Sequence, residues 1–143
     1  MIVRFARFSD KDAWLRMRLA LWPDAGSDEV DRFFAGELRE PRAVLVAAEQ
    51  GALAGFAELS IRNVAEGCTS GNVAYLEGWY VEPAFRRRGV GRALVAAAEE
   101  WARSRGCTEF ASDAEIDNDA SAKAHAALGF AEVEQIRCFR KSL

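Results

Sequence analysis

The chain has 143 residues, about half of them hydrophobic, and a formal net charge of -3. This length suits one domain over residues 1–143 with a real buried core, and the acidic balance argues against a nucleic-acid-binding protein. The three cysteines, Cys68, Cys107 and Cys138, lack the spacing of a disulfide framework or a zinc site, so no metal is expected.

The N-terminus intersperses charged residues among apolar ones, unlike a secretory signal peptide, and no apolar run approaches the roughly 20 residues of a membrane span. These two observations predict a soluble, cytoplasmic protein that does not bind a membrane.

The first half of the chain predicts a strand, two helices and a hairpin. Residues 2–8 alternate apolar and polar side chains, and helical spacing then begins at Ser9, a good N-cap, and ends at Pro23. A second helix is expected over residues 27–40. Residues 43–62 contain two apolar runs around Gln50-Gly51, which is typical of a β-hairpin.

The second half predicts alternating strands and helices. Strands are expected over residues 73–82, 107–113 and 131–141, with a helix from about residue 90 to 106 and another that Gly129 closes. The order βαα, hairpin, βαβαβ predicts an α/β fold whose parallel part lies in the second half. We expect a mixed central sheet of six to seven strands, flanked by about four helices.

Four arginines and two glycines stand where the third helix begins, in the stretch FRRRGVGRAL at residues 85–94. This stretch could be a solvated basic turn, a Walker loop or another phosphate-binding loop. It lacks the Gly-Lys-Ser/Thr of a Walker loop, and Gly89-x-Gly91 is not completed as a Rossmann motif. The remaining pattern, R-x-x-G-x-G from Arg86 to Gly91, favours an anion held by backbone N–H groups at a helix N-terminus.

The loop, Val81-x-Pro83 before it, and Asn118 and Leu128-Gly-Phe after it resemble the GCN5-related N-acetyltransferase family. The resemblance implies the fold of that family, acetyl-CoA as co-substrate, and a backbone N–H near Val81 that polarises the acetyl carbonyl. It also implies a set of residues that bind the cofactor, namely Trp79, Val81, Arg86, Arg87, Arg88, Gly89, Val90, Gly91, Arg92, Asn118 and Ser121.

Further stretches, among them LWP, GFAELSIR, YLEGWYVEPAFRRRGV and HAALGF, resemble one group in this family, the aminoglycoside 6'-N-acetyltransferases. This resemblance implies direct acetyl transfer to the 6'-amine of a cationic antibiotic, which confers resistance, and a homodimer. Two alternatives stay open: the same chemistry on another small amine such as a polyamine or amino sugar, and a non-catalytic module that binds CoA.

Two carboxylates are the candidate catalytic residues. Glu77 interrupts the apolar strand YLEGWYV, where burial of an unpaired carboxylate is costly, and the adjacent Gly78 would permit a bulge or a close backbone approach. Asp113 ends a strand of the parallel part, where ligands gather. The plainer interpretations are a solvent-facing glutamate and a capping aspartate.

The resemblance implies an acidic pocket for the substrate ammonium groups, made by Glu77, Asp113 and Glu134, with Trp22 against a sugar ring. Glu134 could instead lie on a solvent-exposed face of its strand, and Trp22 could be a core residue. His125 is the only histidine and stands where many members of the family have a tyrosine that protonates the leaving thiolate. Histidine could replace that acid, the thiolate could leave without one, or His125 could be structural.

Overall fold

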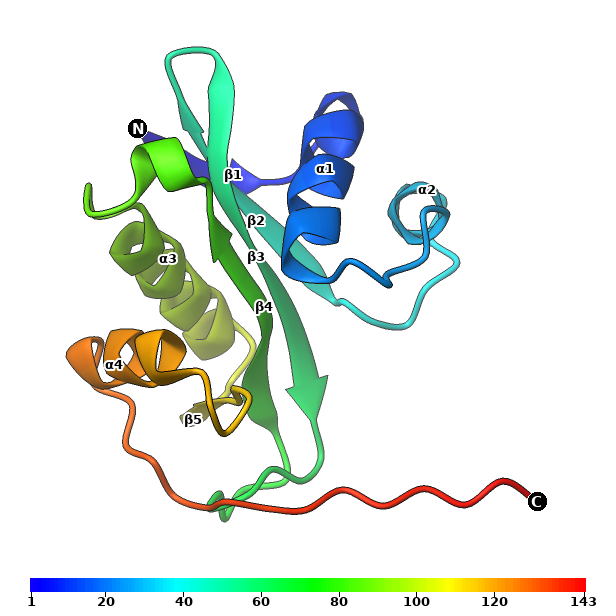
Figure 1. Cartoon of the computed structure of the whole chain (residues 1–143), viewed down its shortest axis with the longest axis vertical. Helices are drawn as coiled ribbons and strands as arrows, with labels where there is room; N and C mark the ends of the chain where they lie inside the picture. The colour runs from blue at the N-terminus through cyan, green and yellow to red at the C-terminus, as the bar shows by residue number, and fades with distance from the viewer.

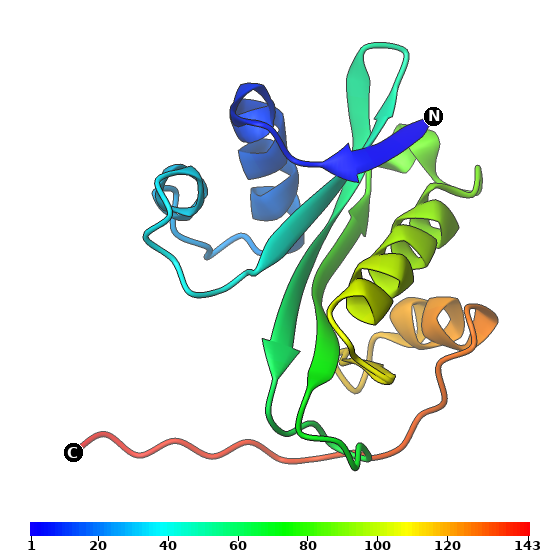
Figure 2. The ribbon, with the colours of Figure 1, turned by 180° about the vertical axis from the view of Figure 1, so that it is seen from behind.

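The computed structural model describes residues 1–143 as a five-stranded sheet with helices on both faces (Figures 1 and 2). The strands follow their order in the chain, with β1 to β4 antiparallel and β5 parallel to β4. Their bounds are β1 Ile2–Phe5, β2 Ala43–Glu49, β3 Ala52–Arg62, β4 Val73–Val81 and β5 Glu109–Ser112.

Four α-helices cover the sheet, two on each face, as the two opposite views show. The helices α1 (Lys11–Leu21) and α2 (Glu29–Phe34) lie on one face, and α3 (Val90–Ser104) and α4 (Asp119–Ala127) on the other. Single 3₁₀ turns, η1 at Phe8–Asp10 and η2 at Pro83–Phe85, precede α1 and α3. No helix is long and apolar enough to span a bilayer.

The alternation of side chains along β2 and β3 divides the core into two layers. Leu45 and Leu59 point to the α3 face and pack with Leu94, whereas Val46 and Phe56 point to the α1 face and pack with Trp14. Successive strand residues face opposite sides of a sheet, so strands covered on both faces are apolar at nearly every position. The two clusters therefore fix the orientation of the central strands.

The predicted α/β class and the four helices are confirmed, but the expectation of six to seven strands is wrong. The missing strand is the one predicted over residues 131–141: these residues are exposed, form no strand and extend away from the sheet (Figure 1). Alternation along this segment is real, but a strand also needs a neighbouring edge to hydrogen-bond with. The segment reaches no such edge of its own chain.

The second helix and the first cap also differ from the prediction. The helix expected over residues 27–40 spans only Glu29–Phe34, and Gly36 follows it with a φ of 72°. A left-handed residue directly after a helix is a common helix terminator. Ser9 lies inside η1, and the N-cap of α1 is Asp10, whose carboxylate accepts a hydrogen bond from the Arg7 N–H at 2.7 Å.

Candidate active site

A β-bulge in β4 presents Glu77. Glu58 of β3 pairs with Gly78 and the next residue, Leu59, pairs with Leu76, so Glu77 is the extra residue without a partner. A bulge bends its strand and re-aims the side chain of the extra residue. The predicted role of Gly78 in a bulge is confirmed, and the carboxylate of Glu77 is 23% exposed rather than buried in the sheet.

Glu77 and Asp113 belong to one polar cluster with Arg62 and Tyr75. The Arg62 guanidinium donates to both carboxylate oxygens of Glu77, at 2.9 and 2.8 Å, and lies 3.5 Å from the centre of the Tyr75 ring. The Tyr75 hydroxyl donates to Asp113 Oδ2 at 2.7 Å. We call Glu77 and Asp113, with the space around them, the acidic pocket.

The charges in this cluster are stabilised by their partners. The hydrogen bond to Glu77 is the main cause that raises the pKa of Arg62, so its guanidinium stays positive. Burial is the first cause that raises the pKa of Tyr75, followed by its hydrogen bond to Asp113. Tyr75 therefore stays a hydroxyl donor at neutral pH.

Trp22 lies against Gly78, next to Glu77. A Cβ built on Gly78 would collide with Cη2 of Trp22, so only glycine lets the indole approach the strand this closely. The guanidinium of Arg18 lies 5.1 Å from the centre of the Trp22 ring. The indole is half-buried beside the acidic pocket and is not a full core residue.

A buried ion pair lies next to Trp22, because Arg18, which contacts the Trp22 ring, is paired with Glu58. Glu58, which is 2% exposed, accepts hydrogen bonds from Arg18 Nε at 2.5 Å and from Trp14 Nε1 at 3.1 Å. Buried charges are tolerated when they are paired and hydrogen-bonded in this way. The pair thus links α1 to the bulged part of the sheet.

The loop before α3 leaves a run of backbone N–H groups free. No protein acceptor receives a hydrogen bond from the N–H groups of residues 87–92. Gly89 is the N-cap of α3 with a φ of 80°, and Arg87 also has a positive φ, of 60°. Free N–H groups at the positive end of a 15-residue helix are suited to bind an anion.

The arginines of this loop have unequal contacts. Arg86 donates to the carbonyl oxygen of Val81 at 2.9 Å, and Arg88 pairs with Glu49 at 3.1 Å. Arg87 and Arg92 are exposed and form no ion pair. The backbone N–H groups therefore define the candidate anion site, and the side chains of Arg87 and Arg92 are free to interact with a ligand.

The strands β4 and β5 diverge at one end, and we call the region between their diverging ends the slot. Their pairing ends at Leu76 and Ser112, so β4 beyond Leu76 has no neighbour on that side. Trp79 lies on this part of β4, and its Nε1 is buried without a hydrogen-bond partner. A Cβ on Gly91 would be 3.0 Å from the Trp79 ring, a tight contact, so the helix N-terminus lies close against this indole.

His125 closes the slot on the α4 side. Its Nδ1 is 2.7 Å from the carbonyl oxygen of Ser121, which can only accept, so Nδ1 carries the proton. Its Nε2 is 2.8 Å from Ser112 Oγ, and its ring packs edge-on against Trp79. Asn118 is the N-cap of α4 and accepts a hydrogen bond from the Ser121 N–H at 3.1 Å.

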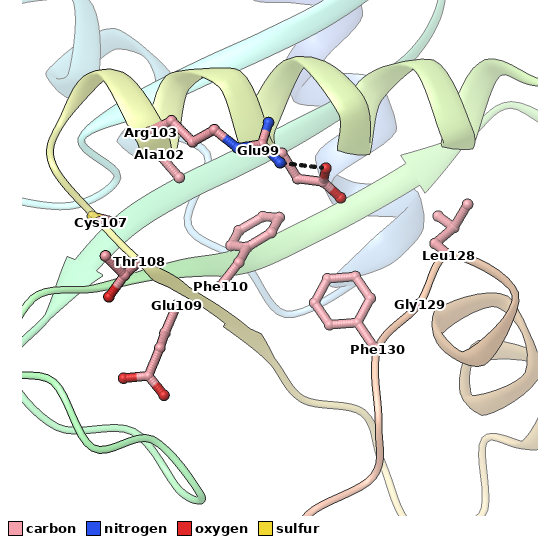
Figure 3. Close-up of a pocket in the computed structure, with 10 residues that line it drawn as sticks. All are labelled: Glu99, Ala102, Arg103, Cys107, Thr108, Glu109, Phe110, Leu128, Gly129 and Phe130. Atoms are coloured by element: carbon pink, nitrogen blue, oxygen red, sulfur yellow. Dashed lines mark ion pairs between the residues drawn. The ribbon is translucent and has the colours of Figure 1, made fainter.

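Two cavities open elsewhere on the surface. A cavity of about 580 Å³ opens between α3, β5 and the turn after α4, with Phe110, Leu128 and Phe130 around it (Figure 3). A second, of about 730 Å³, has Arg39, Arg42, Arg62 and Arg105 in its wall. Arg62 is the one residue of the Glu77 cluster that lines either cavity.

The structure brings together most of the predicted site residues. Trp22 contacts Gly78 next to Glu77, which Arg62 and Tyr75 link to Asp113, and Trp79 contacts His125 of α4 and lies against Gly91 of the loop. Glu134 is not among them, because it lies on the exposed segment that leaves the sheet. Sequence reasoning missed Arg62, Tyr75, Arg18 and Glu58.

The missed residues had no local signal. Arg62 and Glu77 are 15 positions apart in the chain, and their contact depends on the register of β3 with β4 and on the bulge between them. A charged residue inside an apolar strand was the one usable sign, and Glu58 in GFAELSIR shows it as clearly as Glu77 does.

Comparison with known proteins agrees with this geometry. Residues 10–130 match the acetyltransferase (GNAT) family. The chain is 57% identical over 147 residues to aminoglycoside N(6')-acetyltransferase type 1 of Klebsiella aerogenes, covering 99% of this chain and 97% of that protein. It is 41% identical to the protein of the same name from Stenotrophomonas maltophilia, with 99% and 93% covered.

A solved structure of AAC(6')-Iy in complex with the bisubstrate analogue CoA-S-monomethyl-acetylneamine superposes with a TM-score of 0.91 at 36% identity, covering 99% of this chain and 98% of the other. The chain belongs to the GNAT family of acetyltransferases, and within it to the group that the aminoglycoside N(6')-acetyltransferases form.

Proposed function

We propose that this protein transfers the acetyl group of acetyl-CoA directly to the 6'-amino group of an aminoglycoside. The observation that carries the proposal is the position of Glu77: the bulge places its carboxylate where β4 loses its β5 neighbour. A carboxylate and a free strand edge thus meet at one point. The relatives' printed activity and the bisubstrate analogue bound to AAC(6')-Iy point to the same reaction.

The free N–H groups of residues 87–92 would hold the pyrophosphate of CoA, with Arg87 and Arg92 adding positive charge. The pantetheine arm would lie along the unpaired edge of β4 at Trp79 and Val81, and Asn118 and Ser121 would contact the cofactor from α4. The unpartnered Trp79 Nε1 and the close approach at Gly91 fit a slot built for a ligand.

Glu77 would accept the proton that the ammonium must lose before the amine attacks, and a backbone N–H near Val81 would stabilise the oxyanion. As the tetrahedral intermediate collapses, the C–S bond breaks and CoA leaves as a thiolate, which the second proton lost by the amine neutralises. Asp113 would bind a second ammonium group, and Trp22 would pack against a sugar ring beside Glu77. Holding the thioester and the amine together in this geometry supplies much of the rate enhancement.

The test is acetyl transfer by the purified protein. Thiol release from acetyl-CoA is followed with a panel of aminoglycosides, a polyamine and an amino sugar, and NMR of the product locates the acetyl group. Acetylation of the 6'-amine supports the proposal. Turnover with the polyamine or amino sugar alone would assign a different acceptor, and CoA binding without any turnover would indicate a binding module.

We also propose that the protein is a homodimer, in which residues 131–143 of one copy pair with the other. The outer edge of β5 is unpaired and borders the cavity in Figure 3, whose wall includes Phe110 and Phe130. The exposed segment carries four large apolar side chains, Val133, Ile136, Phe139 and Leu143. Exposed strand edges and apolar segments of this kind tend to be covered by a partner.

Light scattering after gel filtration tests the assembly. The full chain should have the mass of a dimer, and a chain that ends at Phe130 should have the mass of a monomer. Dimers of equal stability in both forms would place the interface elsewhere. Glu134 lies on the same segment, so its expected role in the acidic pocket depends on where this segment docks.

A further inference from the structure

Arg62 places a positive charge where the proposed mechanism needs the acceptor ammonium. Its Nε and Nη2 donate to Oε1 and Oε2 of Glu77 at 2.9 and 2.8 Å, which is the paired geometry of the strongest arginine–carboxylate contacts. The charge of Glu77 is thus balanced by Arg62. An ammonium that approaches Glu77 meets a like charge within a few ångströms.

Arg62 also extends toward the second carboxylate of the acidic pocket. Its guanidinium lies 3.5 Å from the centre of the Tyr75 ring, and the hydroxyl of Tyr75 is bonded to Asp113. The four side chains therefore run in the order Glu77, Arg62, Tyr75, Asp113. An acceptor that reaches both carboxylates must span the position of the guanidinium.

The contact is placed where a ligand can break it. The side chain of Arg62 is 37% exposed and that of Glu77 is 23% exposed. Ion pairs at such partly exposed positions are weak, because water solvates the separated charges. Arg62 can thus swing into solvent without leaving a buried charge behind.

We propose that Arg62 is a resident counter-ion that every acceptor must displace from Glu77. A monoamine exchanges one ion pair for another and gains little. A polycation also gains a contact with Asp113, to which Arg62 donates no hydrogen bond, and this gain offsets the cost of displacing Arg62. This inference rests on the proposed acetyltransferase function and adds the residue with which acceptors compete for Glu77.

Steady-state kinetics of Arg62→Gln and Arg62→Lys test the inference, with neamine as the polycationic acceptor and glucosamine as the monoamine. Arg62→Gln should lower the KM for neamine by about two- to fivefold, the size expected from loss of one competing exposed ion pair. It should raise kcat/KM for neamine and for glucosamine by a similar factor, because both acceptors displace the same ion pair, and the KM for acetyl-CoA should not change. Arg62→Lys should fall between this variant and the wild type.

Arg4→Gln is the matched control, because Arg4 makes a similar two-point contact with Asp10, at 2.7 and 3.0 Å, on the far edge of the sheet. It should leave both acceptor KM values unchanged. A higher KM for neamine in both Arg62 variants, with normal folding by circular dichroism, would overturn the inference and make Arg62 part of the acceptor site. Wild-type protein that acetylates no amine would instead contradict the proposed function.

Discussion

The indole of Trp22 lies against the backbone of Gly78, so closely that any side chain at position 78 would collide with it. Gly78 follows the bulged residue Glu77, so one contact joins the end of α1 to the candidate catalytic carboxylate. The position of Trp22 and the shape of the bulge therefore depend on each other.

Gly78→Ala should displace Trp22 and distort the bulge. We expect a loss of about 1–3 kcal/mol in the free energy of unfolding, as for other overpacked sites, and a raised KM for the aminoglycoside. Denaturant unfolding and kinetics measure the two effects. Gly71→Ala is the control, since its Cβ would meet nothing closer than 3.9 Å. Equal stability of the two variants would mean that the Trp22 indole moves aside without a loss of stability.

Glu77→Gln should remove the proposed base and keep the size of the side chain. Turnover should fall by about 10²- to 10⁴-fold, the usual contribution of general base catalysis, while the Kd for acetyl-CoA stays the same. Calorimetry gives the affinity and thiol release gives kcat. Glu132→Gln, on the exposed C-terminal segment, should have normal turnover. Normal turnover of Glu77→Gln itself would remove Glu77 from the mechanism.

Gly89→Val should weaken CoA binding beyond its effect on folding. Gly89 has a φ of 80°, which strains a β-branched residue, and the new side chain would cover the free N–H groups of the loop. Gly106→Val is a close match, because Gly106 has a φ of 77° and equally open surroundings at the other end of α3. Both variants should lose stability, and only Gly89→Val should bind CoA more weakly by calorimetry. A similar affinity in the two would show that the loop is only a turn.

Glu58→Gln should be among the most destabilising polar substitutions in the chain. It removes the buried one of the two carboxylates that pair with Arg18 and leaves only the partly exposed Glu29, at 2.6 Å; breaking comparable buried pairs costs about 3–5 kcal/mol. The exposed pair of Glu100 with Arg103 provides the contrast, and Glu100→Gln should cost less than about 1 kcal/mol. Urea unfolding at neutral pH measures the loss of stability in each variant. Similar losses in both would contradict the role given to the buried pair.

Asp10 should make the fold sensitive to acid. Hydrogen bonds from Arg4 are the main cause that holds its pKa below the ordinary value, so the folded chain binds this proton less readily than the unfolded chain. This contribution to stability is present above the ordinary aspartate pKa, near 4, and is lost as the pH falls through the lower folded value. Asp10→Asn should be less stable than the wild type at pH 7, and the difference should shrink toward pH 3. A constant difference across this range in unfolding experiments would rule the ion pair out as its cause.

Local chemistry determined much of the fold. The Gln50-Gly51 turn was readable from residue type and has the two positive φ values, 52° and 81°, that a tight hairpin needs. The helix start at Val90 after the glycine loop, and the close of α4 before Gly129, followed from cap chemistry in the same way. Apolar runs in 43–62 and 73–81 likewise indicated strands, which the structure confirms.

The sequence by itself thus determined the class of fold, the glycine–arginine loop before α3 and the unusual carboxylate at Glu77. Only the tertiary structure decided which charges meet: Arg62 with Glu77 depends on strand register and a bulge, and Arg18 with Glu58 joins a helix to a strand 40 residues later. It also decided that residues 131–141 leave the sheet, because alternation sets which face a residue occupies but not whether an edge is there to pair with. Local propensity is short-ranged, whereas register, pairing and ion contacts are set by the packing of the whole chain.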